Sequence, residues 1–97
     1  MSGLHPRVGE LRVRIDALDE QIVRLLAERY EIVREVARFK PDAAAVRAPD
    51  RVGEVIGRVR AQAERHGLPP ALAERCYRLL IEEFTALELA RQAEPQR

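Results

Sequence analysis

The 97 residues are enough for one small domain, residues 1–97, whose core alone is only marginally stabilising, so self-association is expected. The 17 Lys and Arg residues nearly balance the 16 Asp and Glu residues, which excludes a chain-wide basic field for nucleic acid or an anionic membrane. Any bound anion must therefore be small and locally recognised. One cysteine and an N-terminus without an apolar run typical of a signal peptide predict a soluble cytoplasmic protein.

The segment from Val8 to Lys40 contains no proline, and its apolar residues recur at the spacing of one long helix. Pro41 is predicted to end this helix, because its ring clashes with the preceding turn. The helix would span about 50 Å at about 1.5 Å per residue, more than two shorter helices of the same chain can cover. We therefore expect a homodimer in which the long helices intertwine about a two-fold axis.

Two further helices are predicted from their end signals. Asp50 is suited to be the N-cap of a short second helix, and Gly67 is suited to the left-handed position that ends it. A medium third helix is predicted to begin near Pro70, because proline is tolerated in a first turn, and to run to about Gln92. Strand signals are absent, so the predicted fold class is all-α with a long, a short and a medium helix.

Several cations fall at positions that are predicted to face inward. Arg29 and Lys40 are 11 residues apart, about three helical turns, which places both on one side of the long helix. Arg51 lies in the first turn of the second helix, where a cation opposes the helix dipole. A buried charge is costly unless it is paired, so these residues either reach solvent at an edge or bind an anion. Lys40 and Arg51, at the two ends of one loop, together favour an anion site.

Arg12 is a fourth candidate, but about 25 Å of helix separates it from Arg29 in its own chain. In an antiparallel crossing of two long helices centred near residue 24, Arg12 of the partner subunit comes level with the stretch between Arg29 and Lys40. A shared site at the dimer interface is therefore geometrically possible.

Glu88 places an acid on the inward stripe of the third helix, four residues after Phe84. One interpretation is a salt bridge to an inward cation. The other is an acid kept partly protonated by burial, which can donate a hydrogen bond to a substrate oxygen. Both interpretations remain open on the sequence, and no arrangement of residues predicts a metal site or a glycine-rich phosphate loop.

The motifs that carry a family resemblance run through most of the chain. They are R-x-x-I-D-x-L-D, L-L-x-x-R followed eleven residues later by K, and the later segments H-G-L-P-P and L-L-I-E-E. As a composite pattern, over about residues 8–92, the chain resembles the all-helical chorismate mutase family. The resemblance implies a homodimer with two equivalent active sites, each completed by an arginine from the other subunit, and no cofactor or metal.

Residue by residue, the resemblance implies a binding site for a dianion. Arg12 of one subunit and Arg29 of the other would bind the two substrate carboxylates. Lys40 would reach the ether oxygen and a carboxylate, and Arg51 would belong to the cationic wall. Glu88 occupies the position that faces the ether oxygen, so Lys40, Glu88 and Arg29 are the predicted catalytic residues.

The reaction of the family explains this collection of cations. Chorismate, an intermediate of the shikimate pathway to aromatic amino acids, rearranges to prephenate through a chair-like pericyclic transition state. No acid, nucleophile or cofactor is needed. The protein must hold the reactive conformer and stabilise the negative charge that grows on the ether oxygen, which preorganised cations can do.

Two positions depart from the pattern of typical mutases. Val52 stands where they carry a Glu that accepts the ring hydroxyl, and Phe84 stands where a small hydroxyl residue is common. R-F-K followed by A-P-D-R-V is similar to isochorismate pyruvate lyase, a relative that releases salicylate and pyruvate and also carries Val at that position. Glu88 argues against the lyase, because its bacterial forms carry Gln there, as do many mutases.

The sequence thus predicts a chorismate mutase-type enzyme, with the isochorismate lyase as a close alternative. An amino-chorismate mutase is a third possibility, because the loss of Glu at position 52 would alter how a ring amine is received. A hypothesis from another class is a non-catalytic helical dimerisation or regulatory module. Such a module would need the apolar stripes but not inward Arg29, Lys40 and Glu88.

Overall fold

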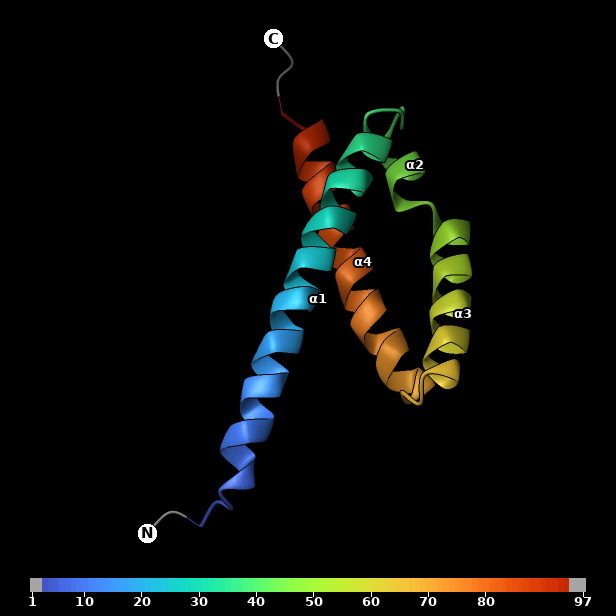
Figure 1. Ribbon diagram of the computed structural model, residues 1–97. Coiled ribbons are helices and arrows are strands. Elements are labelled where there is room, and N and C mark those ends of the chain that lie inside the picture. The colour runs from blue at the N-terminus through green and yellow to red at the C-terminus, as the bar shows by residue number, and fades with distance from the viewer. Residues whose placement is uncertain (1–2, 95–97) are drawn as a thin grey trace. The chain divides into compact units, whose positions relative to one another are not determined.

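The computed structural model describes residues 3–94, and within them every regular element is a helix. The helices are α1 (Arg7–Ala37), α2 (Ala43–Arg47), α3 (Pro49–Arg65) and α4 (Pro70–Gln92), as Figure 1 shows. The predicted all-α fold class is confirmed, and the long, short and medium helices correspond to α1, α3 and α4. The short α2 is an addition to them.

The chain divides into two compact units at the junction between Ile32 and Val33. The first unit contains most of α1, and the second contains the last residues of α1 together with α2, α3 and α4. No residue of α1 is buried. Its large apolar side chains are instead exposed, among them Leu11, Ile15, Leu18, Ile22 and Leu25. A stripe of this kind leaves much apolar surface in contact with water.

α1 ends at Ala37, whereas the sequence predicted a helix to Lys40. Beyond Ala37 the backbone tightens: the N–H of Phe39 donates to the carbonyl of Val36, and that of Lys40 to the carbonyl of Ala37. The physical reason lies in Pro41, which disfavours helical geometry in the residue before it. Lys40 therefore belongs to a turn, and its predicted place on the helix face was wrong.

The loop predicted between Pro41 and Pro49 contains α2. Asp42 caps this helix by accepting a hydrogen bond from the backbone N–H of Ala45 at 2.9 Å. α2 packs against α4, and its Val46 is one of the buried residues of the second unit. A helix of 5 residues is too short to show a periodic pattern, so the sequence could not predict it from periodicity.

α3 begins after Ala48, and the predicted N-cap Asp50 instead lies within its first turn. Ala48 has left-handed backbone angles, with φ at 36°. Its carbonyl accepts hydrogen bonds from the N–H groups of Arg51 and Val52. Left-handed geometry costs a non-glycine residue about 1–2 kcal/mol, so the surrounding packing of α2 and α3 must hold this junction. Asp50 still contributes, because a carboxylate in a first turn complements the helix dipole.

α3 and α4 form an antiparallel hairpin (Figure 1). Gly67 turns the chain between them with φ at 75°, which confirms the left-handed position predicted for it. The core of the hairpin consists of Val59 and Ala63 from α3 and Ala73 from α4, with Tyr77 partly buried against them. These small side chains let the two helices approach closely, and the hairpin fixes the course of α4.

An exposed ion-pair cluster also links α3 to α4. Glu74 pairs with Arg60 at 2.7 Å and with Arg78 at 2.8 Å. Hydrogen bonds from Arg78 and then from Arg60 lower the pKa of the Glu74 carboxyl. Because this pKa is lowered in the folded protein, the cluster's contribution to stability is present near neutral pH and is lost as the pH falls through the lowered pKa.

Candidate functional site

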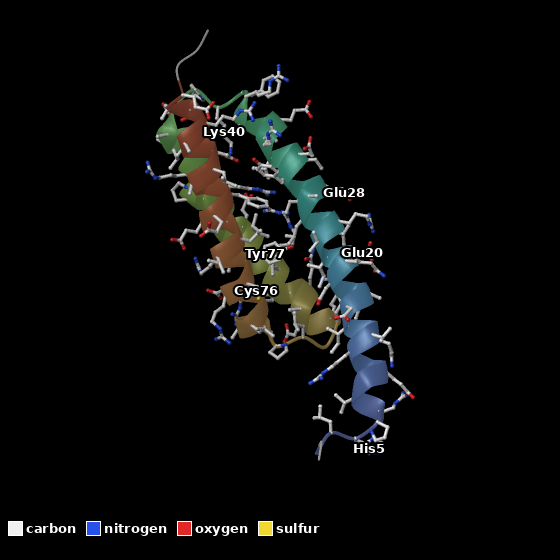
Figure 2. All side chains as sticks on the ribbon, turned by 90° about the vertical axis from the view of Figure 1, so that its left-hand side faces the viewer. His5, Glu20, Glu28, Lys40, Cys76 and Tyr77 are labelled. Atoms are coloured by element: carbon white, nitrogen blue, oxygen red, sulfur yellow. The ribbon has the colours of Figure 1, made fainter. Side chains whose placement is uncertain are left out.

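Lys40 and Glu88 meet in the second unit. The Nζ atom of Lys40 lies 3.4 Å from Oε2 of Glu88, although the two residues are 48 positions apart in the chain. Figure 2 shows Lys40 beside the last turns of α4. The turn after α1 supplies the ammonium, and α4 supplies the carboxylate.

Glu88 is buried, with 7% of its side chain exposed, and no other charged or polar residue in the described range 3–94 is buried. Its predicted inward position is therefore confirmed. An ionised carboxylate in such a place needs a charge partner, because burial removes its hydration. Lys40, whose side chain is 23% exposed, supplies that partner while it keeps access to solvent.

The Lys40–Glu88 contact leaves the ammonium available to a ligand. Charge-assisted N–H···O bonds are usually about 2.7–2.9 Å long, so a separation of 3.4 Å marks a loose pair. An ammonium has three donors, and a single carboxylate oxygen occupies one of them. Of the two interpretations of Glu88, the structure shows the contact that a salt bridge requires, and both interpretations remain predictions.

The ion pair opens onto a cavity of about 320 Å³. The cavity is lined by Ala37, Arg38, Lys40, Pro41, Glu88, Arg91 and Gln92. Its volume is at the lower end of the range of about 300–1,000 Å³ typical of small-molecule sites. Three cations face it, so its chemistry suits an anion. No group of His, Cys, Asp and Glu suited to a metal ion occurs within residues 3–94.

The other predicted site residues of the second unit do not line this cavity. Arg51 is mostly exposed and pairs with Glu54 on its own helix at 3.2 Å. Val52 and Phe84 are half-buried, on α3 and α4 respectively. The structure therefore brings two of the five predicted residues of this unit to the cavity, and their roles remain predictions.

Arg12 and Arg29 belong to the first unit, where Arg12 is exposed and Arg29 is half-buried. Sequence reasoning missed Arg38 and Arg91, which line the cavity. Arg38 begins the R-F-K motif, where it was given no role, and lies two positions before Lys40. Arg91 lies three positions, about one helical turn, after Glu88.

Comparison with known proteins decides the family. The family model for chorismate mutase type II matches residues 11–89, a range that includes all seven predicted site residues. The chain belongs to the chorismate mutase type II family. This is a catalytic family, as the sequence resemblance implied.

Individual relatives of this family point to two reactions. The chain is 28% identical over 83 residues to a chorismate mutase of Methanocaldococcus jannaschii, covering 84% of each chain. It is 30% identical over 82 residues to an isochorismate pyruvate lyase of Pseudomonas aeruginosa, covering 84% of this chain and 81% of the relative. It is 36% identical over 81 residues to the bifunctional chorismate mutase/prephenate dehydratase of Escherichia coli, covering 82% of this chain and 21% of that protein. The identities are too alike to separate the mutase from the lyase.

The described helices were also compared with the requirements of a membrane span. None of them combines the length and the apolar character needed to cross a bilayer.

Proposed function

We propose that this chorismate mutase family member rearranges chorismate to prephenate. The observation that carries the proposal is the loose pair of Lys40 with buried Glu88 on a cation-lined cavity. The non-catalytic module considered above has no need for a buried acid beside a lysine. The family match and the mutase relatives support the same activity.

The proposed mechanism uses position and charge. As the C–O bond of the ether breaks and the new C–C bond forms, negative charge grows on the ether oxygen, and the Lys40 ammonium stabilises it. Arg29 and Arg12 of the partner subunit hold the two carboxylates in the reactive conformer, because guanidinium groups bind carboxylates with two parallel hydrogen bonds. Atoms and protons balance within the substrate, so the reaction calls for no co-reactant.

The proposed assembly is a homodimer with shared sites. It is supported by α1, which has no buried residue and exposes its apolar stripe. Surfaces of this kind are normally covered by a partner, and a two-fold arrangement covers both stripes at once. The proposed location is the cytoplasm, where the shikimate-pathway substrate would be met, with neither nucleic acid nor membrane as a partner.

The decisive experiment for the function offers the purified protein chorismate and isochorismate separately. Prephenate from chorismate, formed at a rate that exceeds the uncatalysed reaction by orders of magnitude, is the expected result. If isochorismate yields salicylate and pyruvate while chorismate yields no prephenate, the protein is an isochorismate pyruvate lyase and the mutase proposal is rejected. No product from either substrate would reject both activities.

A second candidate, isochorismate pyruvate lyase, is favoured by the Pseudomonas relative and by Val52. We expect Val52→Glu to raise the ratio of mutase to lyase turnover by about 5- to 150-fold, because one hydrogen bond to the substrate hydroxyl is worth about 1–3 kcal/mol. Gly53→Glu is the matched control, since it adds the same acid at an exposed neighbour where a Cβ meets no atom within 4 Å. A ratio that is equal in both variants removes Val52 as a substrate marker.

Glu88 can be tested by a substitution that removes its charge. An ionised carboxylate beside the ether oxygen opposes the charge that develops there, whereas the amide of glutamine can donate a hydrogen bond to that oxygen. We therefore expect Glu88→Gln to keep or raise kcat/KM for chorismate at neutral pH, which steady-state kinetics measures. An inactive Gln variant would assign Glu88 the role of an ionised partner of Lys40.

A further inference from the structure

The charge on the cavity exceeds what Lys40 and Glu88 supply. These two groups cancel when both are ionised, and a cancelled pair attracts a dianion weakly. Arg38 and Arg91 add two cations, so three cations and one carboxylate leave a formal excess of two positive charges. This excess comes entirely from two arginines to which neither the sequence motifs nor the family resemblance gave a role.

Neither arginine is neutralised within the described part of the chain. Arg51, Arg60 and Arg78 of the same unit each pair with a glutamate. Arg38 and Arg91, by contrast, form no ion pair with any of residues 3–94. Both side chains are exposed, so their charge acts at the mouth of the cavity and is open to a ligand from solution.

Stabilisation of a helix end explains the position of only one of the two arginines. Arg91 lies in the last turn of α4, where a cation complements the negative end of the helix dipole. Arg38 lies in the turn that follows α1, where its backbone N–H donates to the carbonyl of Glu35. The two come from segments far apart in sequence and converge on one cavity, which helix stabilisation does not require.

We propose that Arg38 and Arg91 form an anion-capture pair that attracts the incoming substrate dianion at the mouth of the Lys40–Glu88 cavity, before its carboxylates reach Arg29 and Arg12 of the partner subunit, and that selects dianions over monoanions. The inference rests on the proposed function for the identity of the substrate. Two cations at the mouth of the cavity attract a dianion from solution and so raise its local concentration near Lys40. The pair acts on binding, while the bond rearrangement depends on Lys40.

The test measures binding and turnover side by side. Calorimetry gives Kd for isophthalate, a rigid non-reacting dicarboxylate, and for the monoanion benzoate, at about 25 mM and about 250 mM salt, since screening separates electrostatic from other losses. Chorismate kinetics give KM and kcat. The variants are Arg91→Gln, Arg38→Gln, Arg91→Lys and the control Arg75→Gln, which neutralises an exposed arginine of α4 outside the cavity.

We expect each neutral variant at positions 38 and 91 to raise Kd for isophthalate by about 3- to 10-fold at low salt, and by less than about 2-fold at high salt. KM for chorismate should rise in parallel, with kcat unchanged. Arg91→Lys should stay close to wild type because it keeps the charge. Benzoate has half the charge, so its Kd should rise by only about 2- to 3-fold at low salt, and the control Arg75→Gln should change little. Thermal unfolding of each variant shows whether a loss of binding is caused by a destabilised fold.

Contrary outcomes separate the two proposals. A wild-type protein that binds no dicarboxylate, or losses that Arg75→Gln reproduces or that salt leaves unchanged, would overturn the capture pair even if chorismate is turned over. The expected isophthalate pattern without turnover of chorismate or isochorismate would sustain the capture pair as an anion site and reject the proposed function. A fall in kcat at constant KM would also overturn the capture role.

Discussion

Replacing Lys40 by methionine is expected to lower kcat for chorismate by about 100- to 1,000-fold, the usual effect of removing one donor from a charge-stabilising site. Methionine keeps an unbranched apolar stem of similar reach and removes only the ammonium. The charge that develops on the ether oxygen then loses its nearest cation, while the carboxylates keep their arginines. KM should therefore change much less than kcat, and steady-state kinetics measures both.

Lys40→Met is also expected to lower the stability of the fold, and this effect must be separated from the effect on catalysis. Without Lys40, buried Glu88 loses the partner that lies 3.4 Å away, and removing one partner of a buried ion pair costs about 3–5 kcal/mol. The double variant Lys40→Met/Glu88→Gln removes that charge and should recover thermal stability while kcat stays low. Arg47→Met, which neutralises an exposed cation in α2, is the control for charge loss in the same loop. A Lys40→Met protein with kcat within about 3-fold of wild type would exclude Lys40 from the chemistry.

Mixing two inactive variants should restore activity if the sites are shared between subunits. Arg12→Ala and Lys40→Met proteins are each expected to be nearly inactive as homodimers. After subunit exchange, each heterodimer places both defects in one site and leaves the other intact, so random pairing restores about one quarter of wild-type activity. Unfolding and refolding the mixed chains together ensures exchange, and chorismate turnover measures recovery.

The controls for mixing are each variant carried through the same procedure alone. Recovery that grows with the fraction of heterodimer supports the proposed contribution of Arg12 of the partner subunit. Full exchange without recovery would place Arg12 and Lys40 in the same subunit's site or outside the site altogether. Sedimentation that shows a folded monomer at micromolar concentration would reject the dimer itself, and it would leave the exposed stripe of α1 to be explained otherwise.

The sequence by itself determined the secondary structure closely, because that depends on local chemistry. Apolar periodicity located the long helix and end signals located the other two. Gly67 marked the left-handed turn between α3 and α4, because a residue without Cβ adopts that geometry freely. The errors were at helix ends. α1 stops at Ala37 because Pro41 constrains the residues before it, and α3 starts after Ala48, a cap that offers no side-chain signal.

The sequence also placed Glu88 on an inward stripe and marked Lys40 as the chain's lone lysine, but only the tertiary structure decided that they meet. A contact between residues 48 positions apart depends on the α3–α4 hairpin and on α2 packing against α4, and neither is a local property. The same packing decided which cations share the cavity. No sequence pattern gave Arg38 or Arg91 a role, because the potential at a site is the sum of the charges that the fold brings together. Helical periodicity reports only which side of its own helix a residue occupies.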